Sequence, residues 1–254
     1  GNRFEFRAVG SNQSIAGAQV ALNTILSESL DFVTDEIEKI TKGDAKKLNA
    51  ACQKVIQAIM KKHGHVVFNG DGYAEAWQRE AAKRGLPNMK ATPEALAGLT
   101  DKDVIAVFGK YGVLSMDELH SRQEIYYEQY NQHIKTESLL VVKIAKTIIL
   151  PAAVRYQGEL AGIAANLKAV GVTGAVPALK EISALVDKMD KAIVALEKII
   201  AKSDFKNIQA EAEYKHSKTL PAMLAVREAA DAMEGLVADD LWPLPSYQEM
   251  LFIK

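Results

Sequence analysis

The chain has 254 residues, and its 31 Lys and Arg nearly balance its 32 Asp and Glu, for a net charge of −1. Lys and Glu are interleaved rather than blocked, which argues against a general binder of nucleic acid or membrane surfaces. Hydrophobic residues make up 48% of the chain and aromatic residues 7%. This composition predicts a mainly α-helical protein with enough apolar residues for one large or two smaller cores.

The cysteine count and the hydropathy of the sequence further restrict the class of protein. Cys52 is the single cysteine, so an intramolecular disulfide and a cysteine-based metal site are excluded, which suits a reducing cytoplasm. The most apolar run, residues 139–154, contains two lysines and Pro151 and is too short and too charged to span a bilayer. No signal peptide is recognisable. The chain lacks a Met start and opens directly into strand-like sequence, so we expect a fragment of a longer protein.

Residues 2–9 alternate charged and apolar side chains, the period of a β-strand. The strand would carry Arg3, Glu5 and Arg7 on one face and two phenylalanines on the other. A carboxylate between two guanidinium groups is suited to a divalent cation and to phosphate or carboxylate oxygens. The alternative is an edge strand with a solvated charged face, which is common in proteins and which the residues alone favour.

A long amphipathic helix is predicted over residues 15–40, ended by Gly43, with Asp44 as the cap of the next helix. The apolar stripe of the first helix is Leu22, Leu26, Leu30, Val33, Ile37 and Ile40. The seam of the second is Leu48, Cys52, Val55 and Ile59. Cys52 is therefore interpreted as a core residue rather than a nucleophile.

The region from residue 63 to residue 114 predicts short, irregular elements. His63 and His65 are two positions apart and do not share a helix face, so a cation near a helix C-terminus is favoured over a metal site. Residues 69–72, Asn-Gly-Asp-Gly, form a turn cluster. Two glycines beside an aspartate can approach a phosphate, but the spacing matches no nucleotide fingerprint, so a plain connector is favoured.

Residues 115–171 predict a single helix roughly 80 Å long. Ser115 is its expected N-cap, Gly171 its expected stop, and Pro151 is expected to kink it near Ile148. The face predicted to pack is Tyr126, Tyr130, Ile134, Val141, Ile144 and Ile148.

Two more long helices follow. The first has a heptad seam at Leu179, Ile182, Val186, Met189, Ile193, Leu196 and Ile200. The second is expected to be capped by Ser203–Asp204 and kinked at Pro221. Its seam is Phe205, Ile208, Ala212, Val226, Ala229 and Met233. Together these segments predict a bundle of long antiparallel helices.

Three stretches in order resemble one family. Residues 2–26, with their Arg-x-Glu-x-Arg pattern, polar turn and small-residue helix, resemble the last catalytic strand and following helix of glutamine synthetases. Residues 68–73, Phe-Asn-Gly-Asp-Gly-Tyr, and the tail 239–252 resemble the large type III branch found in bacteria. The fold class that follows is mainly α, a kinked bundle of long antiparallel helices with one N-terminal β-strand left from the synthetase catalytic domain.

The resemblance implies roles for three residues. Glu5 falls on the family's glutamate that ligates a divalent metal, Arg3 on an arginine that contacts nucleotide phosphate, and Arg7 on one that contacts glutamate and its phosphorylated intermediate. The reaction is glutamine formation from ATP, glutamate and ammonia through γ-glutamyl phosphate, with Mg²⁺ or Mn²⁺. The rest of the catalytic barrel is absent, so we expect the chain alone to be inactive. Partners implied are the remainder of the catalytic domain and other subunits of a double-ring homo-oligomer.

The expected organisation is a catalytic strand and helix in residues 1–42, an irregular helical subdomain in 43–114, a long-helix bundle in 115–238 and an extended tail in 239–254. The bundle is hypothesised to make subunit contacts. An alternative is a stand-alone helical oligomerisation module without catalysis. A third, weaker idea is a metabolite sensor in the bundle, although the sequence indicates no specific pocket.

Overall fold

The computed structural model of the protein describes residues 14–245 and 247–251. Over these residues it is helical and contains no strand, which confirms the mainly α prediction. The strand predicted at residues 2–9 lies outside the described residues, and Arg3, Glu5 and Arg7 lie there with it. The chain divides into two compact units, residues 1–123 and 124–254.

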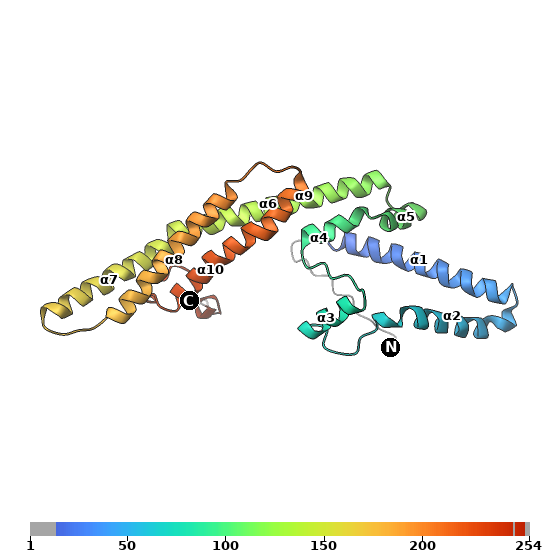
Figure 1. Ribbon diagram of the computed structural model, residues 1–254, viewed down its shortest axis with the longest axis horizontal. Coiled ribbons are helices and arrows are strands. Elements are labelled where there is room, and N and C mark those ends of the chain that lie inside the picture. Colours follow the sequence, from blue (N-terminus) through green and yellow to red (C-terminus); the bar gives the residue numbers. More distant parts are fainter. Residues whose placement is uncertain (1–13, 246, 252–254) are drawn as a thin grey trace. The chain divides into compact units, whose positions relative to one another are not determined.

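The first unit is built on a hairpin of two helices, α1 (Ala16–Thr41) and α2 (Leu48–His63) (Figure 1). Gly43 ends the first helix with φ +83°, and the Asp44 side chain accepts a hydrogen bond from the backbone N–H of Lys46 at 3.0 Å, as predicted for the turn. Shorter helices follow: α3 (Glu75–Lys83), α4 (Thr92–Ala97) and α5 (Lys102–Lys110). Single 3₁₀ turns occupy Ala45–Lys47, Gly64–Val66 and Gly98–Thr100.

The α1–α2 hairpin buries fewer apolar side chains than the predicted apolar stripes imply. Ala51 and Val55 of α2 are buried, and Cys52 is half-buried. Leu26 and Leu30, assigned to the packing stripe of α1, are more than half exposed, and Leu48 of the α2 seam is also exposed. Each helix of the hairpin buries mainly the face turned toward the other, so apolar residues beyond that face stay in solvent.

The long helix begins and ends where its caps were predicted. It starts as α6 (Met116–Ile144), and Ser115 and Glu118 exchange the two hydrogen bonds of a capping box. It ends as α7 (Leu150–Ala169). Gly171 has φ +79°, and the N–H of Val172 donates to the Leu167 carbonyl at 2.9 Å, the 6→1 bond of a Schellman motif.

The regular α-helix is interrupted before Pro151, close to the position expected from the sequence. Ala145–Ile149 forms a π-helical turn, in which the N–H of Leu150 reaches back to the Ala145 carbonyl. The same arrangement recurs before Pro221, where Lys215–Thr219 is a π-helical turn and the N–H of Leu220 donates to the Lys215 carbonyl. The wider turn gives room for a proline ring that would clash with the preceding α-turn.

The second unit packs α7, α8 (Val176–Ile200) and α10 (Leu220–Glu234) around one core (Figure 1). The predicted α8 seam is confirmed, because Ile182, Met189, Ile193 and Leu196 are almost fully buried. The remaining seam positions, Leu179, Val186 and Ile200, pack against that core.

The packing face predicted for the long helix is confirmed at Ile134, which is buried, and at Val141, which packs against the core, but it is wrong at both ends. Tyr126, Ile144 and Ile148 are exposed, whereas Tyr127 and Ala145 are buried. The buried positions, which include polar side chains, are Leu119, Tyr127, Asn131, Ile134, Ser138 and Ala145. Two small polar residues lie on the true face, so hydrophobicity alone pointed to its neighbour.

The last long helix is split into α9 (Ile208–Tyr214), the π-turn and α10. The expected cap at Ser203–Asp204 is wrong, because Asn207 has the extended backbone and its side chain accepts from the N–H of Ala210 at 2.8 Å. After α10, Trp242 and Leu244 return to pack on the core of the second unit. A short helix, α11 (Tyr247–Leu251), follows in the tail.

Candidate functional site

The predicted catalytic residues Arg3, Glu5 and Arg7 lie outside the described part of the chain. Within residues 14–245 and 247–251, no three His, Cys, Asp or Glu side chains are grouped so that they would hold a metal ion. His63 ends α2 and His65 lies in the following 3₁₀ turn. No helix in that part of the chain is both long enough and apolar enough to cross a bilayer.

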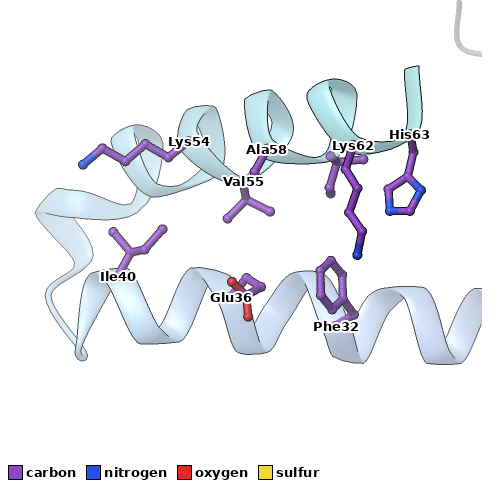
Figure 2. A pocket seen from close by; sticks show the side chains of 9 residues that line it. Phe32, Glu36, Ile40, Lys54, Val55, Ala58, Lys62 and His63 are labelled. Atoms are coloured by element: carbon purple, nitrogen blue, oxygen red, sulfur yellow. The ribbon is translucent and has the colours of Figure 1, made fainter. Parts of the chain in front are cut away.

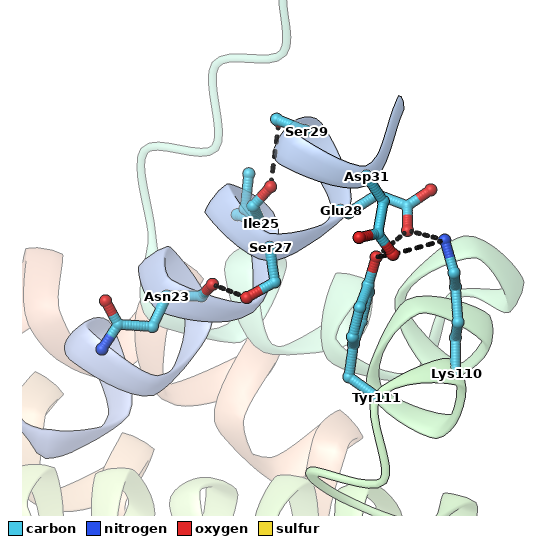
Figure 3. A network of polar contacts seen from close by, with 8 residues as sticks. All are labelled: Asn23, Ile25, Ser27, Glu28, Ser29, Asp31, Lys110 and Tyr111. Atoms are coloured by element: carbon cyan, nitrogen blue, oxygen red, sulfur yellow. Dashed lines mark hydrogen bonds and ion pairs between the residues drawn. The ribbon is translucent and has the colours of Figure 1, made fainter. Parts of the chain in front are cut away.

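A polar cluster in the first unit joins α1 to the end of α5 (Figure 3). The Lys110 ammonium lies 2.6 Å from Glu28 and 3.6 Å from Asp31. The Tyr111 hydroxyl lies 2.9 Å from Glu28 and 2.6 Å from Asp31. Two carboxylates on consecutive turns of α1 are therefore bridged by one ammonium and one phenol from a segment about 80 residues later in the chain.

These contacts shift the titration of the groups involved. Hydrogen bonds from Lys110 and then Tyr111 lower the pKa of Glu28 below its usual value. The hydrogen bond to Glu28 raises the pKa of Lys110. Burial, followed by the hydrogen bond to Asp31, raises the pKa of Tyr111 to about 12. The phenol thus stays protonated and the carboxylate charged at neutral pH, so the cluster is a clamp between two helices rather than an acid–base pair.

A groove of about 280 Å³ lies between α1 and α2 (Figure 2). Its floor is apolar and includes Phe32 and Val55, and Lys62 and His63 extend from the end of α2 toward Phe32. The complete lining is Phe32, Glu36, Ile40, Lys54, Val55, Ala58, Ile59, Lys62 and His63. The groove offers an apolar surface with a charged rim, which is suited to packing against another chain segment.

The segment that follows α2 is organised by Arg84. Its guanidinium donates to the carbonyls of His65 at 3.1 Å and Val67 at 3.0 Å, and its Nε donates to Glu80 at 2.8 Å. Phe68 stacks on Trp77 with ring centroids 3.9 Å apart. The Arg84 guanidinium carbon also lies within 5.8 Å of both ring centroids, so one arginine fixes the path of the chain between α2 and α3.

The Asn-Gly-Asp-Gly cluster lies in this segment. A Cβ added at Gly70 would clash with the Phe68 ring, so glycine is required by the stack. The Asp71 carboxylate accepts from the N–H of Tyr73 at 2.9 Å, forming an Asx-turn that leads toward α3. These local contacts account for both residues without any ligand, in agreement with the connector interpretation.

Sequence reasoning missed the Glu28–Lys110 cluster and the Arg84 stack. Each joins residues that are far apart in sequence or on different elements, so no periodicity or spacing signals it. The nearest signal in the sequence was the acidic pair Glu28 and Asp31 on α1. Acidic residues on a helix usually face solvent, so the pair did not indicate a contact.

Comparison with known proteins identifies the chain. Residues 51–168 match the family "glutamine synthetase C-terminal domain". The whole chain is 35% identical over 271 residues to the type-3 glutamine synthetase of Dictyostelium discoideum, of which it spans 36%. It is 31% identical over 263 residues to the glutamine synthetase of Bacteroides fragilis (strain YCH46), again spanning 36% of that protein. A glutamine synthetase of Butyrivibrio fibrisolvens is 28% identical over 260 residues, covering 99% of this chain. The chain therefore corresponds to the C-terminal region of proteins named glutamine synthetase, one of them a type-3 glutamine synthetase, and it spans about a third of their length.

Proposed function

We propose that this chain is the C-terminal part of an ATP-dependent glutamate–ammonia ligase in the cytoplasm. The observation that carries the proposal is similarity along the whole chain to three proteins named glutamine synthetase, each of which extends well beyond the matched part. The complete enzyme would convert ATP, glutamate and ammonia to glutamine through γ-glutamyl phosphate.

The contribution of this chain to the active site is Arg3, Glu5 and Arg7. Glu5 ligates one divalent metal ion, Arg3 contacts nucleotide phosphate, and Arg7 contacts glutamate and the transferred phosphoryl group. Cationic groups on one strand face offset the negative charge that develops during phosphoryl transfer. One carboxylate holds Mg²⁺ poorly, so the chain by itself is inactive.

The helical part supplies contacts between subunits of a double-ring homo-oligomer. The support is apolar surface in excess of what the two cores use. Leu30 on α1, Val194 on α8 and Leu224 on α10 are each more than half exposed, as are Ile56 and Met60 on α2. Repeated exposure of large aliphatic side chains is typical of surfaces that are covered in an assembly.

The activity test compares the purified chain with the product of the complete reading frame. The complete protein is expected to form glutamine with ATP and Mg²⁺, and the isolated chain is expected to form none. In the complete protein, Glu5→Gln should reduce kcat by at least about 100-fold, because a metal ligand is lost. Glutamine formation by the isolated chain would overturn the assignment of an incomplete site.

The assembly test uses a matched pair on α8. Val194→Asp should weaken subunit association of the complete protein by at least about tenfold in sedimentation velocity, because a charge would be buried against an apolar partner. Ala195→Asp places the same charge on the adjacent exposed position and serves as the control. A complete protein that stays monomeric at high concentration would refute the assembly role.

The second candidate is a helical oligomerisation module without catalysis. The exposed apolar residues favour it as much as they favour an enzyme subunit. The two are separated by the sequence that precedes Arg3 in the complete reading frame. A barrel-coding region supports the ligase, and its absence supports the module.

A further inference from the structure

The second unit contains a small pocket at the turn between α8 and α9. Its volume is about 190 Å³, and it is formed by side chains of α6, the end of α8, the loop that follows, α9 and the π-helical turn. The lining residues are Lys135, Ser138, Ile199, Ile200, Lys202, Ser203, Phe205, Glu211, Tyr214, Lys215 and Thr219. None of the residues assigned to catalysis contributes to it.

Charge is unevenly distributed around this pocket. The lining residues include three lysines, Lys135, Lys202 and Lys215, and one acidic residue, Glu211. Glu211 is already paired with Lys215 at 2.6 Å. Asp204 lies in the adjoining loop but does not line the pocket. The lining therefore carries an excess of positive charge, which favours an anionic occupant.

The most buried of these cations is Lys215. It is 9% exposed, and its ammonium donates to the Asn131 carbonyl at 2.7 Å and to Glu211 at 2.6 Å. An ammonium has three donors, and no third acceptor for Lys215 is found among the described residues. A buried charge is retained only where it is well paired, so the spare donor beside the pocket is available to an incoming oxygen.

The π-helical turn brings a second unpaired group to the same pocket. Thr219 lies four residues after Lys215, at the other end of the turn, and is 3% exposed. Its hydroxyl makes no hydrogen bond within the described residues, and it is not one of the fully buried polar atoms without a partner, so the oxygen keeps some access to solvent. Widened turns of this kind occur frequently at functional sites. The turn thus presents one ammonium donor and one hydroxyl donor on the same side.

Aromatic rings hold the third cation at the mouth. The Lys202 ammonium lies 5.3 Å from the centroid of the Phe205 ring and 4.9 Å from that of Tyr214. The two rings are tilted against each other with centroids 5.3 Å apart. These contacts keep the ammonium near the pocket without neutralising its charge, because an aromatic face attracts a cation but supplies no anion.

We propose that this pocket binds a small oxyanion, a monophosphate or a short dicarboxylate. Lys215 and Thr219 would donate from the base of the pocket, and Lys135 and Lys202 would provide the remaining positive charge. The volume limits the ligand to about the size of benzene or slightly more, since a cavity of about 150 Å³ accommodates benzene. The proposal concerns binding by the helical part and does not depend on the catalytic function.

The test is calorimetric titration of the purified 254-residue chain with inorganic phosphate in one arm and malonate in the other. Sodium chloride keeps the ionic strength constant, so that general screening does not imitate binding. Saturable one-to-one binding of either anion, with a Kd of about 10 mM or tighter, supports the pocket, and the arm that binds identifies the chemistry. Absence of saturable binding in both arms overturns the proposal.

Substitutions distinguish the pocket from general surface charge. Lys135→Gln and Lys202→Gln are each expected to weaken binding about fivefold, the upper end of what one exposed charge contributes. Lys218→Gln removes a lysine from the exposed side of the same π-turn, outside the pocket lining, and should change the Kd less than about twofold. Both test lysines are exposed, so folding should be retained. Equal weakening by Lys218→Gln and Lys202→Gln would refute a specific site.

Discussion

The ion pair between the buried Lys215 and the half-buried Glu211 can be tested by removing the lysine ammonium. Lys215→Met keeps most of the side-chain volume but deletes the ammonium that donates to Glu211 at 2.6 Å and to the Asn131 carbonyl at 2.7 Å. The carboxylate and the carbonyl are then left without their donor. Breaking a buried pair from one side costs about 3 kcal/mol in the free energy of unfolding. For a unit of this size, that corresponds to a decrease in Tm of about 10 °C.

A second substitution isolates the part of this loss that comes from the unpaired carboxylate. Adding Glu211→Leu to Lys215→Met removes the orphaned charge, and the double variant should lie within about 1 kcal/mol of the parent chain. The difference of about 2 kcal/mol between the single and the double variant is the part of the loss that comes from the unpaired carboxylate. Lys218→Met, on the exposed side of the same turn, should change the stability by less than about 0.5 kcal/mol.

The assay is urea denaturation followed by far-UV circular dichroism, with the midpoint and slope fitted for the three variants and the parent. If Lys215→Met lowers the free energy of unfolding by less than about 1 kcal/mol, the ion pair is more solvated than the burial of Lys215 indicates. A double variant as unstable as the single one would show that the ammonium acts through the Asn131 carbonyl alone.

Three further outcomes are expected. Ser115→Ala should destabilise the chain by about 1 kcal/mol through loss of the α6 cap, whereas Ser121→Ala on the same helix should be nearly neutral, as measured by urea denaturation. Ultraviolet titration should show the Tyr111 phenol, identified by difference from Tyr111→Phe, ionising near pH 12. Because its pKa is raised on folding, its contribution to stability is fully present below about pH 10 and is lost as the pH rises from about 10 through about 12. Gly70→Ala should displace the Phe68 ring and cost about 1–2 kcal/mol, with a change in tryptophan fluorescence from the broken stack.

Local signals predicted much of the helical architecture. The capping box at Ser115 and the left-handed Gly171 were correctly located, because a cap depends on residues adjacent in sequence. The α8 seam was also correct, since its heptad pattern has no interruption and its polar residues lie outside the seam.

Features that depend on tertiary contacts were missed or misplaced. On α6, Tyr126 and Tyr127 are equally apolar neighbours, and the true face continues through Asn131 and Ser138, which have no hydrophobic signal. The N-cap of α9 is Asn207 rather than the predicted Ser203–Asp204, because the loop after α8 is longer than a minimal turn. The oxyanion pocket depends on Lys215 being buried, which a helical periodicity cannot specify for a charged residue.

The two π-helical turns each absorb one extra residue in a long helix. A π-turn contains one residue more than the α-turn it replaces but covers about the same rotation, whereas each residue of an α-helix turns by about 100°. Deleting one residue from Ala145–Ile149 would therefore restore regular winding and leave Ala153 and Leu160 on the core face of α7, but it would remove the room that the wider turn gives to the Pro151 ring. A deletion in a regular turn of α7 would instead rotate every later side chain by about 100°.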